Sequence, residues 1–273
     1  MNLWIISVNF ENTESTSALI DSLSLINSDS IRVGIADNAS SPQSLYKLKQ
    51  IKEKTKLELD IFTFKKNLYY WPAIKKVINN LKNQIGSYPD WVVVCNNDII
   101  FSDSKFFELL LNIDINKYPI IAPNVTNLLG QRLNPFLRSP LSRIQRFYWD
   151  LYFISFPLSV FLLFMKKYLR IFTFKSNTNN ISQKMEIYAA HGSAILFSSS
   201  FFKNGGFLDD NFEMYGEELS VAEIAKKLNL PVTFFPELEL IHLEHSSTLN
   251  ADKRFLYNLA KRSHKYIKST YLK

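Results

Sequence analysis

Cysteine is nearly absent from this sequence of 273 residues, in which Cys95 is the one thiol. One thiol cannot form an internal disulfide, so we expect a protein of a reducing compartment such as the cytoplasm. Histidine is also rare, with four in the chain. His242 and His245 stand close together, but no cysteine or second histidine cluster accompanies them, which argues against a zinc site.

The mean hydropathy of −0.07 excludes a polytopic membrane protein. The N-terminal residues contain no basic region and no small-residue cleavage site, so we interpret them as a first strand rather than a signal peptide. No internal repeat is visible. What is present is an ordinary globular composition, 47% hydrophobic and 21% charged, in a chain long enough for one large α/β domain over residues 1–273.

The chain carries a formal net charge of +7. An excess of this size suits anionic partners, which include nucleotide diphosphates, anionic lipid head groups and nucleic acid. The charge alone does not select among these partners.

Apolar runs typical of buried strands alternate with helical patterns in the first third of the chain. The predicted strands there are 3–9, 31–36, 57–64 and 91–95. The predicted helices between them are 14–26, 45–54 and 72–85. This alternation indicates βαβ units, and therefore a mainly parallel central sheet with helices on both faces. The pattern returns later, with predicted strands at 186–197, 232–235 and 238–242 and a helix at 217–228.

Residues 130–183 interrupt this pattern as a predicted apolar and basic helical insertion. The stretch from Phe147 to Phe164 contains one charged residue, Asp150, and is at the lower edge of the length that spans a bilayer. Its internal polar residues argue against a span, while the surrounding aromatic and basic residues fit a helix or hairpin lying in the membrane interface. The alternative is a hairpin that packs on the domain or in a dimer interface.

The C-terminal segment, 251–273, has the pattern of a basic amphipathic helix. We expect its apolar stripe to dock on the domain or on a membrane, with its charges in solvent. Nucleic-acid binding through this helix is therefore not expected.

Polar residues follow the predicted strands, at the edge where parallel sheets bind ligands. Asp98, which ends Asn96-Asn97-Asp98, could hold Mg²⁺ or Mn²⁺ together with nucleotide phosphates, or could belong to a plain turn. Asp37 could contact a nucleobase or ribose, or could form an Asx turn before Pro42.

Acidic and histidine side chains further along the chain could also carry chemistry. Glu217 and Glu218 begin a predicted helix, where the helix dipole favours acidic residues, but one of them could act as a general base toward an acceptor hydroxyl. His242 could assist a cation that is bound through phosphate. His191, which precedes a buried strand, could equally be a packed core histidine.

The order of these motifs is more specific than any one of them. The chain runs from Ser-Val-Asn-Phe through Ala-Asp-Asn-Ala-Ser-Ser and Lys-Asn-Leu-Tyr-Tyr to Val-Val-Val-Cys-Asn-Asn-Asp-Ile, and then to His-Gly-Ser-Ala-Ile-Leu-Phe, Gly-Gly-Phe-Leu-Asp-Asp-Asn-Phe-Glu-Met-Tyr-Gly-Glu-Glu-Leu and Ile-His-Leu-Glu-His-Ser-Ser. It resembles the glycosyltransferase family 2 enzymes of the GT-A (Rossmann-like) fold, especially the rhamnosyltransferase-like members that build bacterial surface polysaccharides. The resemblance covers residues 3–129 and 186–248.

The resemblance implies a role for each matching position. A nucleotide-sugar would contact Val8, Asn9, Asp37, Asn67, Asn96, Asn97, His191 and Gly192. The metal ion, Mg²⁺ or Mn²⁺, would be bound by Asp98 and His242. Glu218 would be the catalytic base, with Glu217 as its neighbour.

The implied reaction is a single displacement with inversion at the anomeric carbon. A hexosyl or deoxyhexosyl group would move from a nucleotide-diphosphate sugar to a hydroxyl of a glycan or polyprenyl-linked acceptor, in surface polysaccharide biosynthesis. The enzyme would be cytoplasmic and peripheral at the inner face of the cytoplasmic membrane, where the insertion would meet an anionic surface.

Some positions depart from the family pattern. Asn96 replaces the first Asp of the family's Asp-x-Asp motif, Glu218 replaces a commoner Asp, and Tyr69 stands where Gly is frequent. Lys75 and Ser220 also differ. Because of these departures, the sequence does not identify the donor sugar. They also motivate an alternative, a catalytically silent nucleotide-sugar-binding or scaffold protein at the membrane surface.

Overall fold

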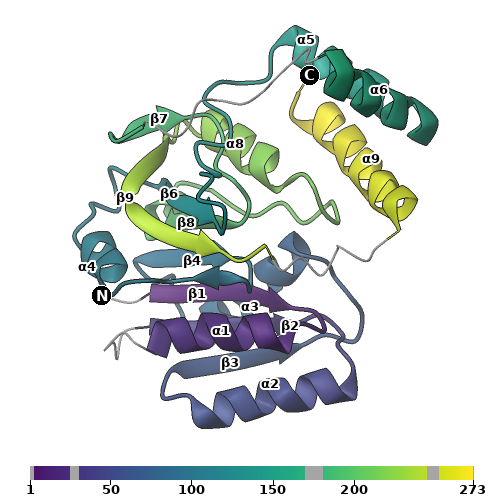
Figure 1. Ribbon diagram of the computed structural model, residues 1–273. Helices are drawn as coiled ribbons and strands as arrows, with labels where there is room; N and C mark the ends of the chain where they lie inside the picture. The colour runs from purple at the N-terminus through teal and green to yellow at the C-terminus, as the bar shows by residue number, and fades with distance from the viewer. Residues whose placement is uncertain (1–2, 25–30, 170–180, 245–251, 273) are drawn as a thin grey trace.

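The structure is a computed structural model that describes residues 3–24, 31–169, 181–244 and 252–272. His245 and part of the insertion, 170–180, lie outside these ranges. Within them, nine strands form one sheet with helices on both of its faces (Figure 1). The strands are β1 (Leu3–Asn9), β2 (Ile31–Asp37), β3 (Glu58–Thr63), β4 (Trp91–Cys95), β5 (Ile99–Ile100), β6 (Ile120–Asn127), β7 (Met185–Ile187), β8 (Ala194–Ser198) and β9 (Val232–His242). The helices are α1 (Thr13–Ser24), α2 (Pro42–Lys54), α3 (Trp71–Ile85), α4 (Lys105–Leu111), α5 (Arg143–Tyr152), α6 (Phe156–Leu169), α7 (Ser199–Lys203), α8 (Glu217–Lys227) and α9 (Lys253–Thr270).

The sheet is mixed, so the prediction of a mainly parallel sheet is wrong. Its strand order is β3-β2-β1-β4-β8-β6-β9-β5, and β7 also pairs with β9. The strands β1 to β4 are parallel, as are β6 and β9, but β8 lies antiparallel between β4 and β6. A strand parallel to β6 would need a connection that crosses back over the sheet. The chain between β6 and β8 makes no such crossover, because α5 and α6 pack on α9. Strand β8 therefore runs antiparallel to β6.

Two predicted strand boundaries also differ from the structure. The predicted strand at 186–197 is divided into β7 and β8 by a loop, and the predicted strands on either side of Pro236 are one strand, β9. Pro236 does not end β9 because it lies at an irregularity, where the register with β6 shifts between Pro123 and Asn124. A proline has no N–H to donate to the ladder and is tolerated at such a position.

The hydrophobic core forms two layers, one on each face of the sheet. Val92 and Val94 of β4 pack with α3 and α8, whereas Trp91, Val93 and Cys95 pack with α1, α2 and α4. All five residues of β4 are buried, which confirms the prediction of a buried strand.

Helix α3 lies close to the sheet and brings the loop before it to the ends of the strands. The close approach depends on Gly34 of β2, where an added Cβ would lie 2.7 Å from Val77 Cγ1. Pro72 lies in the first turn, and the helix ends at Gly86 with a φ of 90°, a conformation that favours glycine.

The insertion forms a helical hairpin of α5 and α6 that packs on α9 (Figure 1). Helix α5 begins with a capping box in which Ser142 and Gln145 exchange hydrogen bonds. Near its end, Asp150 lies 3.0 Å from His264 Nε2 and 2.7 Å from Lys268 Nζ. Among the described residues, no helix has both the length and the apolar character needed to cross a bilayer.

Candidate active site

A cavity of about 520 Å³ lies beyond the carboxyl ends of β1, β2, β4 and β9. Its lining comes from segments that are far apart in the sequence. Ten of the twelve residues that the sequence predicts for the site line this cavity: Val8, Asn67, Asn96, Asn97, Asp98, His191, Gly192, Glu217, Glu218 and His242. The fold therefore gathers the carboxylates, histidines and amides into one place.

Asp98 and His242 form one pair of side chains in the cavity. They come from the ladder between β5 and β9, in which Ile99 pairs with His242 and the Leu243 N–H donates to the Asp98 carbonyl at 2.9 Å. Asp98 Oδ1 lies 3.0 Å from His242 Nε2, and both side chains are largely buried. Asn96 lies beside them, with its Nδ2 3.4 Å from His242 Nε2.

This pair fits a divalent cation. His242 Nδ1 is buried without a hydrogen-bond partner, which is unusual for a polar atom in a protein interior, and the one contact of the buried Asp98 Oδ1 among the described residues is His242 Nε2. The same part of the chain contains no group of three or more His, Cys, Asp or Glu residues that could hold a metal. A cation here would therefore take its remaining ligands from a bound diphosphate and from water.

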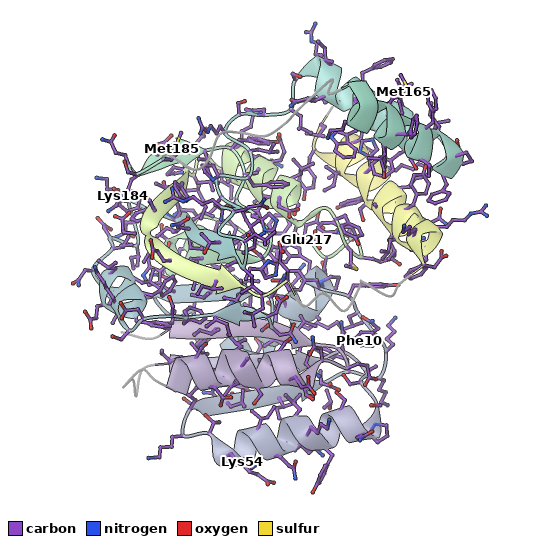
Figure 2. All side chains as sticks on the ribbon, in the orientation of Figure 1. Phe10, Lys54, Met165, Lys184, Met185 and Glu217 are labelled. Carbon is purple, nitrogen blue, oxygen red and sulfur yellow. The ribbon has the colours of Figure 1, made fainter. Side chains whose placement is uncertain are left out.

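Glu217 and Glu218 form a second pair, at the start of α8. Gly192 N–H donates to Glu218 Oε1 at 3.1 Å, and an added Cβ on Gly192 would lie 2.8 Å from that oxygen. Glu217 Oε2 accepts from the Gly216 N–H at 2.8 Å. Because residue 192 is a glycine, its backbone can approach the Glu218 carboxylate. Glu217 lies in the interior of the molecule, whereas Phe10 lies at its edge (Figure 2).

The two carboxyl groups differ in their proton affinity. Burial, with the charge of Glu218 adding to it, raises the pKa of Glu217 to about 8. Burial also raises the pKa of Glu218. Because Glu217 keeps its proton at neutral pH, the negative charge of the pair rests on Glu218. A carboxylate with a raised pKa is well suited to accept a proton near neutral pH.

The His191 side chain is neutral, and hydrogen bonds fix its orientation. Burial, together with the charge of His242, lowers the pKa of His191 to about 4. Its Nδ1 accepts from the Ser193 N–H at 3.1 Å, so the ring proton is on Nε2, and its own backbone N–H donates to Asn134 Oδ1 at 2.8 Å. His191 can therefore donate a hydrogen bond into the cavity without carrying a charge.

In the loop before α3, Tyr69 has a backbone conformation that is more common for glycine. Tyr69 has a φ of 63°, in the left-handed region, and its N–H donates to Asn67 Oδ1 at 2.7 Å. Asn38 stabilises the loop from β2: its Nδ2 donates to the Tyr69 carbonyl and its Oδ1 accepts from the Leu68 N–H. These bonds stabilise a backbone conformation at Tyr69 that glycine adopts more readily.

Asn9 and Asp37, the other two predicted site residues, are buried behind the cavity lining. Asn9 Nδ2 donates to Asp37 Oδ1 at 3.2 Å, and Asn9 Oδ1 accepts from Thr16 Oγ1 at 2.9 Å. Asn97 lines the cavity, but its Nδ2 donates to the Asn12 carbonyl and to Thr16 Oγ1. In this structure all three asparagine and aspartate side chains hold the strand ends and α1 together.

Sequence reasoning did not assign several cavity residues. Tyr70 lines the cavity and its hydroxyl lies 3.4 Å from the Gly192 carbonyl. Phe255, Leu256 and Leu259 of α9 form an apolar wall. Their spacing predicts an apolar stripe on a helix but not which surface the stripe covers, so the sequence held no signal that α9 borders the site.

No protein-family model matches this chain, and no curated protein has a matching sequence. Solved structures do match it. They include GalNAc-T7 with UDP, GalNAc and Mn²⁺ (TM-score 0.63, 12% identity, 100% of this chain) and the mannosyltransferase PcManGT from Pyrobaculum calidifontis with GDP-Man and Mn²⁺ (0.56, 10%, 97%). A third is a fragment of S. aureus TarS with UDP-GlcNAc (TM-score 0.58, 10% identity, 99% of this chain).

These three proteins are glycosyltransferases of the GT-A type. The match covers 49%, 61% and 73% of their chains, so this chain spans about half the length of the GalNAc-T7 chain. The chain therefore has the GT-A glycosyltransferase fold, which confirms that part of the sequence prediction.

Proposed function

We propose that this protein transfers a sugar from a nucleotide-diphosphate sugar to an acceptor hydroxyl, with inversion at the anomeric carbon. The observation that carries the proposal is one cavity that holds both the Asp98–His242 pair and the Glu217–Glu218 pair. The fold supports it, because similar structures contain UDP, GDP-Man with Mn²⁺, or UDP-GlcNAc.

On the donor side, Asp98 and His242 would hold Mg²⁺ or Mn²⁺, which would offset negative charge on the leaving diphosphate. Neutral His191 adds a hydrogen-bond donor from Nε2. The loop from Asn67 to Tyr70, fixed by Asn38, borders the same end of the cavity and orients the donor.

On the acceptor side, Glu218 receives the proton of the attacking hydroxyl. The Gly192 N–H fixes one of its oxygens, so the other can face the acceptor. Glu217 stays protonated, which keeps a second negative charge out of the site. The apolar wall of α9 lines the same cavity.

At a finer level, the proposal is a family 2 enzyme similar to rhamnosyltransferases, acting in surface polysaccharide biosynthesis. Its acceptor would be a glycan or a polyprenyl-linked glycan, and it would work at the cytoplasmic face of the membrane. The motif order from Ser-Val-Asn-Phe to Ile-His-Leu-Glu-His-Ser-Ser supports this level of the proposal.

The test is release of nucleoside diphosphate from a panel of UDP-, GDP- and dTDP-sugars, with Mn²⁺, Mg²⁺ or EDTA. We expect one donor to be hydrolysed slowly in the presence of a cation, and Asp98→Ala to abolish this. With an acceptor present, Glu218→Gln should lower transfer by at least about a hundredfold, because one general base contributes on the order of 10²–10⁴.

Glu223→Gln is the matched control, since Glu223 is on the same helix and bonds Tyr188 outside the cavity. It should retain activity. A chain that binds a nucleotide sugar in thermal-shift assays but releases no diphosphate from any donor would instead be a silent binding protein, and the proposal would be wrong.

A further inference from the structure

The outer face of the α5–α6 hairpin exposes a stripe of large apolar side chains. On α6, Pro157, Val160, Phe161 and Phe164 follow the spacing that normally faces a core, yet Val160, Phe161 and Phe164 are 51%, 56% and 54% exposed. Helix α5 adds Ile144 and Phe147, which are 65% and 63% exposed. An apolar surface of this kind on a folded chain marks a contact site.

The inner face of the hairpin packs on α9, and these contacts fix the orientation of the hairpin. Phe153 stacks on His264 with ring centroids 4.7 Å apart, and Phe156 lies edge-on to Tyr257 at 5.4 Å. The Lys261 ammonium donates to the Ile154 carbonyl at 2.8 Å. The exposed stripe therefore lies on the side of the hairpin that faces away from the domain.

The charge of the chain is concentrated in this insertion. Residues 130–183 contain eight of the 32 Lys and Arg residues but one of the 25 Asp and Glu residues. The insertion thus has a formal charge of +7, equal to that of the whole chain, and the remaining residues are neutral overall, with 24 charges of each sign. Arg143, which precedes Ile144 on α5, is exposed, as is Arg138 in the loop before that helix.

We infer that the outer face of α5–α6 docks on an anionic lipid bilayer. The apolar side chains enter the interfacial region, while the basic residues of the insertion interact with acidic head groups. The helices lie on the membrane and do not cross it.

A second copy of the chain is a poorer occupant of this face. A symmetric dimer would place two segments of formal charge +7 against each other, and like charges facing across an interface oppose association. A bilayer supplies the opposite charge. Docking does not depend on the proposed reaction, but it would bring the cavity near the membrane surface, since α9 contacts the hairpin and also lines the cavity.

The experiment is sedimentation of the full chain with two kinds of vesicle, phosphatidylcholine alone or phosphatidylcholine mixed with phosphatidylglycerol. We expect at least tenfold tighter binding to the anionic vesicles, weakened by salt. Phe161→Glu with Phe164→Glu should lower this binding at least tenfold, as should the same two positions changed to Ser. An unchanged cooperative thermal unfolding transition in solution checks that the variants are folded.

Leu128→Glu with Leu129→Glu is the matched control, because these leucines are more exposed than Phe161 and Phe164, at 63% and 79%, but follow β6 outside the hairpin. The control should bind vesicles as the natural chain does. The proposal is overturned if the natural chain binds neither vesicle, or if the Phe161 and Phe164 variants bind like the control. A dimer in light scattering that these variants convert to a monomer, without vesicle binding, would make the face a subunit interface instead. Because vesicle binding uses no nucleotide sugar, these results stand apart from failure of the proposed reaction.

Discussion

At the scale of single residues, the two adjacent carboxyl groups at the start of α8 differ in their hydrogen-bond partners and therefore in the roles that we propose for them. Glu218 is bonded to the Gly192 N–H and is available to accept a proton, whereas Glu217 is bonded to the N–H at the helix start. The cost of burying two negative charges side by side is avoided because Glu217 remains neutral.

This arrangement predicts how stability depends on pH. Folded Glu217 keeps its proton up to about pH 8, but in the unfolded chain the carboxyl ionises near its ordinary pKa of 4.5. The stability it contributes is therefore fully present below about pH 4.5 and is lost as the pH rises to about 8. We expect the melting temperature to fall over this range, and to fall less in Glu217→Gln.

Thermal unfolding of both proteins between about pH 5 and pH 8.5 checks this linkage. Glu213→Gln is the control, since Glu213 is exposed and paired with Arg262, and it should follow the natural chain. If the melting temperatures of Glu217→Gln and of the natural chain fall equally with pH, folded Glu217 does not hold the proton assigned to it.

At the scale of elements, α9 stabilises the loop that leads into α8. Asp209 is 1% exposed and accepts hydrogen bonds from the hydroxyls of Tyr266 and Tyr271, at 2.8 and 2.5 Å. Ser263 Oγ donates to the Met214 carbonyl in the same loop. The position of the Glu217–Glu218 pair therefore depends on contacts made by the last helix.

Changing Tyr266 and Tyr271 together to Phe should lower the free energy of unfolding by about 3 kcal/mol. The reason is that the buried Asp209 carboxylate would lose two hydrogen bonds, and bonds to charged groups contribute about 1.5–3 kcal/mol each. Urea unfolding measures the change. Tyr46→Phe, at an exposed tyrosine, should change stability by less than about 0.5 kcal/mol. A double variant as stable as this control would show that the two bonds contribute little.

The sequence predicts the elements whose burial leaves a pattern in the chain. The all-apolar run of β4 predicts a strand buried on both faces, and the polar residues after it predict a ligand site at its end. The direction of β8 leaves no such pattern, because an apolar strand reads the same whichever way it enters the sheet. The break between β7 and β8 leaves no clear pattern either, since the residues at 189–194 are small except for His191 and contain no proline.

The candidate site was predictable to the extent that its residues follow strands or begin helices. Asp98 and Glu218 do so, and the fold brings both to the cavity. Asn9 and Asp37 satisfy the same rule, yet their side chains bond to each other, because a strand-end polar group can also serve its neighbours. The α9 wall depends on long-range packing that no local pattern encodes.

At the scale of the whole molecule, cation and nucleotide should stabilise the fold together. Under the proposed function, Asp98 and His242 would supply two ligands, too few to hold Mg²⁺ or Mn²⁺ tightly without further oxygen ligands. We expect Mn²⁺ with UDP or GDP to raise the melting temperature by roughly 3 °C or more, and either component alone to raise it less.

Differential scanning fluorimetry of the full chain measures these shifts. Asp98→Ala should remove the part that requires Mn²⁺, while Asp103→Ala, at an exposed aspartate outside the cavity, should retain it. Equal shifts with and without Mn²⁺ for both nucleotides would contradict a metal bound through the diphosphate.

Strand β5 has two residues and lies at the end of the sheet order, yet its pairing with β9 brings Asp98, the residue just before it, next to His242. So short an edge strand can open without unfolding of the sheet, so its amide protons exchange with solvent through local fluctuations. A cation that joins the two side chains would oppose this opening. The Leu243 N–H donates to the Asp98 carbonyl. Protection of this amide from hydrogen exchange would therefore report how long a cation occupies the site.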